Sequence, residues 1–75
     1  MSIAFVLISI IPGKEHEVYN KIYQLEYIVE VHPLLGQYDM IAKIDSEKDI
    51  GNLVINDLRT INGVLDTKTL MEIKL

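Results

Sequence analysis

A glycine-led turn near the middle of the chain, Gly36-Gln37-Tyr38-Asp39, most constrains how this sequence can fold. Apolar, strand-like residues lie on both sides of it, from Ile28 to Leu35 and from Met40 to Ile44. Gly36 has no Cβ and can adopt the positive φ that closes a hairpin. The turn therefore predicts two antiparallel strands, Ile28–Leu35 and Tyr38–Ile44.

The residues before this hairpin predict a strand followed by a helix. Ile3–Ile8 is β-branched and aromatic and is followed by the turn signal Pro12-Gly13, so it is predicted to be a strand. The polar turn after Gly13 leads into Val18, Ile22 and Leu25 at i, i+4 and i+7. This spacing predicts a helix with one apolar face against the sheet.

The residues after the hairpin repeat the same order, a helix and then a strand. Ser46 is the expected N-cap, with Asp49 completing a variant of the capping box. Apolar residues at helical spacing follow from Ile50 to Ile61, and Asn62-Gly63 is interpreted as the helix C-cap. Val64–Leu75 is the last predicted strand.

The order of elements predicts a single domain over residues 1–75 with an α+β, ferredoxin-like βαββαβ fold. Its sheet should have four antiparallel strands with both helices on one face. Pro33 cannot donate a backbone hydrogen bond, so the strand that contains it should lie at a sheet edge or carry a bulge.

The small size of the chain favours self-association. A domain of 75 residues is marginally stable on its core alone, and the absence of cysteine removes disulfides as a means of stabilising it. Ile3–Ile8 is apolar at every position, which is typical of a strand buried on both faces. We expect a second sheet to cover the face that the helices leave open, with Phe5, Val6, Leu7 or their neighbours at the interface.

The charge and the apolar stretches of the chain argue against two classes of partner, nucleic acid and membrane. The net charge is −4, from 11 acidic and 7 basic residues, so we expect no direct binding to nucleic acid. The longest apolar stretch is about half of the ~20 residues that a membrane-spanning helix needs, and no signal peptide is recognisable. We expect a cytoplasmic protein.

Catalytic and cofactor-binding motifs are absent from the sequence, so we expect no enzyme and no cofactor. The only candidates for acid–base chemistry are His16, His32 and a row of tyrosines at helical spacing, Tyr19, Tyr23 and Tyr27. These residues fit solvated or packed surface positions better. A small enzyme of the dimeric α+β barrel type remains the alternative.

The turn and two threonines are the better candidates for a binding site. A free amino acid would pair its ammonium with a carboxylate such as Asp39. Its carboxylate would need N–H groups near Gly36 and hydroxyls such as those of Thr67 and Thr69. Aspartates at turns and threonines on strands are also ordinary, so the residues alone leave both interpretations open.

Four short motifs together resemble one family, the effector-binding domain of the leucine-responsive/asparagine regulators (Lrp/AsnC), often called RAM. The resemblance covers nearly the whole chain, and the turn combined with Thr-x-Thr is its most specific part. The motifs are Ala4-Phe5-Val6-Leu7, Pro12-Gly13-Lys14, Gly36-Gln37-Tyr38-Asp39, and Gly63-Val64 followed by Thr67-Lys68-Thr69.

The resemblance implies a sensor of free amino acids linked to transcriptional regulation of amino-acid metabolism. It implies dimers packed sheet to sheet, further assembly into rings, and association with full-length regulators of the family. The effector would lie at interfaces between dimers. The implied ligand-binding residues are Gly36, Gln37, Tyr38 and Asp39, with Thr67 and Thr69 opposite them.

Two features depart from the family pattern. Members usually carry a helix-turn-helix domain before this one, whereas this chain begins at the first strand, so a stand-alone form is expected. The residue before the turn glycine is often threonine in the family and is Leu35 here. The lost hydroxyl favours the alternative of a purely structural assembly partner of full-length regulators.

Overall fold

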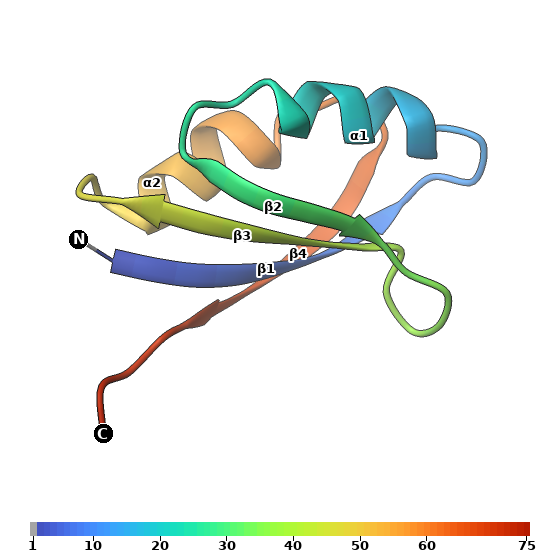
Figure 1. Ribbon diagram of the computed structural model, residues 1–75. Helices are drawn as coiled ribbons and strands as arrows, with labels where there is room; N and C mark the ends of the chain where they lie inside the picture. The colour runs from blue at the N-terminus through green and yellow to red at the C-terminus, as the bar shows by residue number, and fades with distance from the viewer. Residues whose placement is uncertain (1) are drawn as a thin grey trace.

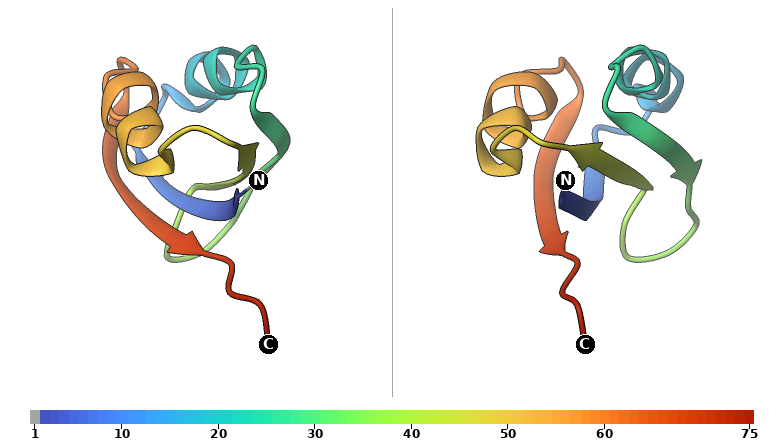
Figure 2. Two further views of the ribbon diagram at one scale, coloured as in Figure 1. Left: turned by 90° about the vertical axis from the view of Figure 1, so that its left-hand side faces the viewer. Right: turned by 60° about the vertical axis from the view of Figure 1, so that its left-hand side comes forward.

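A four-stranded antiparallel sheet, in the order β2-β3-β1-β4, forms one layer of the molecule. The computed structural model describes residues 2–75, and its helical segments all lie on one side of this sheet (Figures 1 and 2). The predicted ferredoxin-like α+β fold is therefore confirmed. The elements are β1 (Ser2–Ile10), α1 (Glu15–Tyr23), β2 (Ile28–Pro33), β3 (Met40–Ser46), α2 (Ile50–Leu53), η1 (Val54–Leu58) and β4 (Val64–Met71).

The side chains of the central strand β1 divide between two faces, because successive Cβ atoms of a strand point to opposite sides. Val6, Ile8 and Ile10 are buried under the helices, whereas Phe5 and Leu7 are only half buried on the opposite side, which we call the open face. The prediction that Val6 could lie at an uncovered face is wrong, because its side chain is fully buried in the core.

The hydrophobic core lies between the sheet and the helices and takes side chains from β1, β2, β3 and every helical segment. Burying one of the larger side chains, such as isoleucine or leucine, stabilises the fold by roughly 1.5–3 kcal/mol. β4 contributes none of the fully buried residues and is held mainly by its pairing with β1. The core residues are Ala4, Val6, Ile8, Ile10, Val18, Ile22, Val31, Met40, Ala42, Ile44, Ile50, Val54 and Leu58.

The helix α1 forms where its apolar spacing predicts it and ends earlier than the row of tyrosines. Val18 and Ile22 are buried against the sheet. Tyr19 and Tyr23 stack with ring centroids 5.8 Å apart. Tyr27 lies beyond the end of the helix, so the interpretation of three tyrosines as one helical row is wrong for this residue.

The second helical region is one α-helical turn, α2, continued by a π-helical segment, η1. Its N-cap is Asp49, whose Oδ1 accepts a hydrogen bond of 2.9 Å from the Gly51 N–H. The predicted cap, Ser46, is wrong because this residue is the last of β3. The hydroxyl of Ser46 instead accepts a bond of 3.0 Å from the Lys48 N–H, in the turn between β3 and α2.

Gly63 closes a turn that leads into β4 and is not the helix C-cap, because η1 already ends at Leu58. Its φ is +108°, a backbone conformation that favours glycine. A Cβ at this position would lie 2.8 Å from the Lys14 Cβ and 2.9 Å from the Val18 Cγ2. Gly63 therefore permits both the turn and the close approach of this segment to α1.

Candidate functional site

The predicted tight turn is a wider loop, Leu34–Asp39, because β2 ends at Pro33 and β3 begins at Met40. The loop connects an edge strand to its neighbour, and this edge position is what Pro33 predicts. The register of β2 shifts between Ile28 and Glu30, away from the proline, which pairs regularly with Met40. Gly36 has φ +152°, and a Cβ there would meet nothing within 4 Å. Backbone conformation, and not lack of space, therefore explains the glycine.

Asp39 fixes the base of this loop to the central strand. Its Oδ2 accepts a hydrogen bond of 2.7 Å from the Ile10 N–H. Its own N–H donates to the Ile8 carbonyl at 2.9 Å, and its carbonyl accepts from the Leu34 N–H at 2.9 Å. Asp39 Oδ1 takes part in none of the hydrogen bonds or ion pairs found within residues 2–75. One carboxylate oxygen thus has a structural role, and the described residues provide no hydrogen-bond or ion-pair partner for the other.

The other turn residues differ in exposure. Gly36 and Gln37 are exposed, whereas Tyr38 and Asp39 are half buried. Exposed backbone N–H groups beside a fixed carboxylate can bind the two charged groups of a small zwitterion. The sequence singled out these residues as candidates but gave no sign of the bond from the Ile10 N–H, because a contact between residues 29 positions apart leaves no local pattern.

Thr67 and Thr69 lie on β4, away from the loop of the same chain. Thr67 pairs with Ile8, and Ile8 pairs with Met40 on its other side. Two strand spacings, about 10 Å, therefore separate Thr67 from the β3 residue that follows the loop. Thr69 pairs with Val6, two residues further from the loop. One chain alone does not bring the turn and the two threonines into direct contact.

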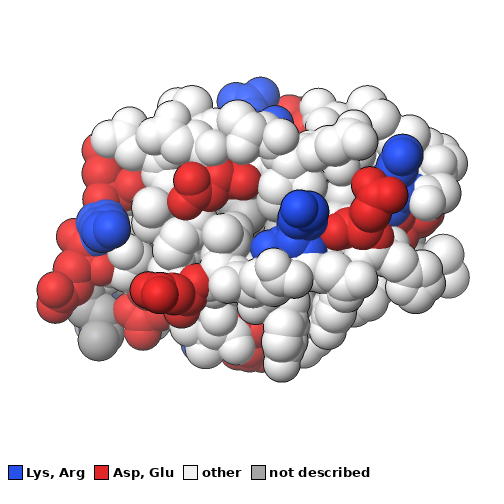
Figure 3. All heavy atoms as spheres, turned by 90° about the horizontal axis from the view of Figure 1, so that it is seen from above, with Lys and Arg blue, Asp and Glu red and all other residues white. Residues whose placement is uncertain are grey.

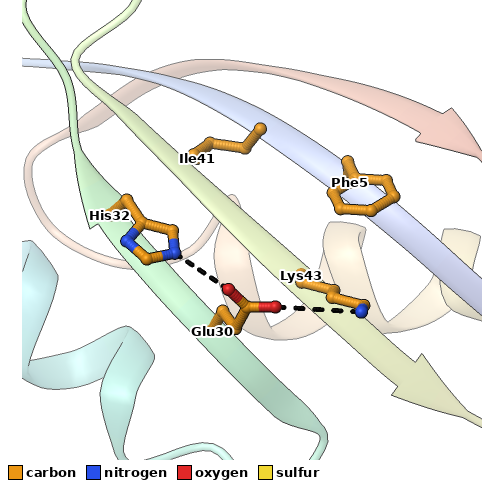
Figure 4. Close-up of a pocket in the computed structure, with 5 residues that line it drawn as sticks. All are labelled: Phe5, Glu30, His32, Ile41 and Lys43. Carbon is orange, nitrogen blue, oxygen red and sulfur yellow. Dashed lines mark hydrogen bonds and ion pairs between the residues drawn. The ribbon is translucent and has the colours of Figure 1, made fainter.

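A hollow of about 60 Å³ lies on the open face, lined by five residues of β1, β2 and β3 (Figure 4). Glu30 bridges the two other polar side chains: its Oε1 is 3.0 Å from the His32 Nε2 and its Oε2 is 3.8 Å from the Lys43 Nζ. Lys43 also lies 5.9 Å from the centroid of the Phe5 ring. The hydrogen bond from His32, aided by Lys43, lowers the pKa of the Glu30 carboxyl. Ile41 completes the lining.

The two histidines do not form a joint acid–base site. His32 lies on the open face, whereas His16 lines a different hollow, of about 310 Å³, with Glu15 and Tyr19 of α1 and with Pro33 and Met40. Neither hollow is lined by a serine, threonine or cysteine that a histidine could activate. The enzyme alternative thus gains no support from these two positions.

A hydrogen bond of 2.6 Å joins the Tyr27 hydroxyl to Asp57 Oδ2 and connects the loop after α1 to η1. Burial raises the pKa of the Tyr27 phenol, and the Asp57 carboxylate raises it further. The sequence assigned Tyr27 to a packing row and did not predict this bond. The two partners lie 30 positions apart, and neither flanks a recognisable motif.

The charges on the helix-covered side are mixed. Lysine and arginine side chains there lie among acidic and uncharged ones, as Figure 3 shows. Within residues 2–75, no group of three or more His, Asp or Glu side chains is arranged to bind a metal ion. The same residues contain no helix with the length and apolar character needed to cross a membrane.

The fold defines the class of this protein: a small α+β domain of the ferredoxin-like type. A family model described as the Lrp/AsnC ligand binding domain matches residues 3–74, so the chain belongs to this family. The resemblance inferred from the sequence motifs is thereby confirmed.

Individual relatives agree with this assignment. The HTH-type transcriptional regulator FL11 from Pyrococcus furiosus is 35% identical over 74 residues, which are 96% of this chain and 48% of that protein. The chain thus spans about half the length of the curated relatives that it matches.

Two solved structures match over nearly their full lengths. The first, FFRP-DM1, is 28% identical with a TM-score of 0.93, and the match covers 97% of this chain and 100% of that one. The second, a hypothetical protein, PHS023, from Pyrococcus horikoshii, is 27% identical with a TM-score of 0.90 and covers 100% and 93%.

Proposed function

We propose that this domain is a non-enzymatic sensor that binds a free amino acid at the Leu34–Asp39 loop and assembles with further copies of itself. Through this assembly, or by joining full-length Lrp/AsnC regulators, it modulates transcription linked to amino-acid metabolism in the cytoplasm. The observation that carries the proposal is Asp39, a carboxylate held at the end of the sheet with one oxygen committed to the protein and one free.

The chemistry of the loop supports an amino acid as the ligand. The free oxygen of Asp39 can accept from an ammonium, and the exposed backbone around Gly36 and Gln37 can donate to a carboxylate. A fold neighbour from Neisseria meningitidis, a transcriptional regulator of 18% identity, has been solved as a complex with L-methionine. That likeness concerns the fold alone.

A second copy would complete the binding site. Thr67 and Thr69 lie on the far side of β1 from the loop, and two strand spacings, about 10 Å, separate Thr67 from Met40 within one chain. An effector held between copies could contact the loop of one and the threonines of another. Binding would then be linked to assembly, because the complete site would exist only in the oligomer.

A thermal-shift screen against the twenty common amino acids tests the proposal, followed by calorimetry on the wild type and Asp39→Asn. Asparagine keeps an oxygen for the Ile10 N–H and removes the negative charge. We expect the affinity of the identified amino acid to fall by roughly 10- to 100-fold, since charge-assisted hydrogen bonds are worth about 1.5–3 kcal/mol.

The control is the folded state of the variant, which circular dichroism should find unchanged. Equal affinity of the wild type and a folded Asp39→Asn variant would remove Asp39 from the site. A screen in which none of the twenty amino acids stabilises the protein would leave the assembly role as the better account.

A further inference from the structure

We propose that a hollow between the first turn of α1 and the end of β2 binds a small, planar heteroaromatic molecule that carries an N–H donor, for example an indole. We call it the α1 hollow; it has a volume of about 310 Å³ and is lined by Glu15, His16, Tyr19, Pro33 and Met40. The inference goes beyond the proposed function, because this site is separate from the loop and lies within one chain.

The size of the α1 hollow is that of a small-molecule site. Pockets that bind small molecules usually have volumes of about 300–1,000 Å³, largely apolar walls and a few polar groups that orient the ligand. The α1 hollow lies at the lower end of this range, so it suits a compact ligand. The hollow on the open face, of about 60 Å³, is too small for such a molecule.

Flat and apolar side chains form the walls of the α1 hollow. The half-buried ring of Tyr19 stacks on Tyr23, with the ring centroids 5.8 Å apart and the planes at 22°. This stacking orients the Tyr19 ring before a ligand binds. Pro33 adds a second ring, and the thioether of the nearly fully buried Met40 packs well against aromatic edges. A planar aromatic ligand therefore makes better contacts here than a branched aliphatic one.

Glu15 supplies an oriented hydrogen-bond acceptor. Its Oε1 accepts a hydrogen bond of 2.8 Å from the Gly13 N–H. Its Oε2 takes part in none of the hydrogen bonds or ion pairs found within residues 2–75. The other acid of the same turn, Glu17, is paired with Lys14 at 3.8 Å. Glu15 Oε2 is thus the acceptor that this turn offers to a ligand.

The charges around the hollow favour an uncharged donor. The Glu15 carboxylate repels an anionic ligand, and the positive end of the helix dipole disfavours a cation beside the first turn of α1. A neutral N–H group avoids both costs and donates to Glu15 Oε2. The walls and the acceptor together therefore select a planar ring system with an N–H group.

The α1 hollow adjoins the base of the candidate effector loop. Pro33 and Met40 pair with each other across β2 and β3, and the Leu34–Asp39 loop connects them. Figure 1 shows α1 running above β2, with its first turn at the end of the strand where this loop begins. A ligand in the hollow lies against the two residues that close the loop without occupying the loop itself.

Titration of the full chain with indole, followed by the NMR shifts of its backbone amides, tests the inference. We expect saturable shifts at His16, Tyr19 and Met40. Benzofuran has nearly the same ring shape as indole but no N–H group, so it cannot donate to Glu15. It should bind roughly 10-fold more weakly than indole.

Two variants and a matched control locate the contacts. Glu15→Gln keeps an oxygen for the Gly13 N–H but removes the charge, and should weaken indole binding roughly 5- to 10-fold. Tyr19→Leu should weaken it about 3- to 10-fold through loss of ring stacking. Glu17→Gln should leave it unchanged, because Glu17 lies in the same turn but lines a different hollow. Circular dichroism should find all of these chains folded.

Shifts that rise linearly with indole concentration, or that lie mainly outside the α1 hollow, would overturn the inference. Equal binding of indole and benzofuran would also overturn it, and this comparison stands even if Tyr19→Leu does not fold. Asp39→Asn should bind indole as the wild type does; a loss of indole affinity in this variant would show that the two sites are not separate. A screen in which no amino acid binds would contradict the proposed function and leave the indole result unaffected.

Discussion

Replacing Asp39 with alanine should destabilise the domain even in the absence of any ligand. The Asp39 Oδ2 is the acceptor for the Ile10 N–H at 2.7 Å, and Ile10 is only 3% exposed. In Asp39→Ala this N–H loses its acceptor at a position that water reaches poorly. The carboxylate is therefore expected to matter for stability as well as for binding.

The magnitude follows from the cost of an unsatisfied buried donor, roughly 1–3 kcal/mol. Asp39→Ala should lose about that much unfolding free energy, whereas Asp39→Asn should lose less because its side-chain oxygen still accepts. Urea unfolding at one fixed protein concentration measures both, with an unchanged m-value as the sign that the same surface is exposed.

The unfolding free energies of the two variants, compared with that of the wild type, test this reasoning. If Asp39→Ala unfolds within about 0.5 kcal/mol of the wild type, the bond to Ile10 is not holding the loop and the reasoning is refuted. If Asp39→Asn is destabilised as much as the alanine variant, the negative charge rather than the hydrogen bond stabilises the loop.

Two further substitutions test the remaining contacts. Gly63→Ala should destabilise by roughly 2–4 kcal/mol, because its Cβ would collide with Lys14 and Val18 at a positive φ; a thermal transition within 3 °C of the wild type would contradict this. Tyr27→Phe should cost about 1–2 kcal/mol near neutral pH through loss of the bond to Asp57. Because the folded state raises the pKa of Tyr27, this contribution is complete below about pH 10 and is lost at higher pH, so urea unfolding should show the two proteins converging there.

The fold could be predicted because the decisive signals are local. The spacing of Val18 and Ile22, and the apolar runs on either side of Gly36, fix the types and order of the elements. Pro33 predicted the edge position of β2 for a reason that holds in any sheet, the missing N–H. These patterns need no knowledge of which residues meet in space.

The errors of the sequence analysis occur where tertiary contacts decide. Serine is a common N-cap residue, but Ser46 pairs with Ser2 of β1 and so belongs to β3. The N-cap is Asp49 instead, and the helix begins at Ile50. Val6 was placed at a possible interface because residues 3–8 of β1 are all apolar. Only the register of the sheet distinguishes its buried face from its open one.

The effector site itself stays a prediction, and the structure adds contacts around it that the sequence did not indicate. The turn residues were identified by composition, and the bond from Ile10 then showed that Asp39 also has a structural role. The open-face group of Glu30, His32 and Lys43 was missed because it spans two strands. Knowledge of the register between β2 and β3 would have indicated this group, because Glu30 pairs with Lys43.

Backbone amide chemical-shift mapping by NMR, with the amino acid identified by the screen, tests the central claim most directly. The account predicts that the largest ligand-induced shifts occur at Gly36, Gln37, Tyr38 and Asp39, with further shifts at Thr67 and Thr69 from the second copy. Shifts confined to the helix-covered side, for example around Lys21 and Thr60, would contradict the assignment of the effector site to this loop.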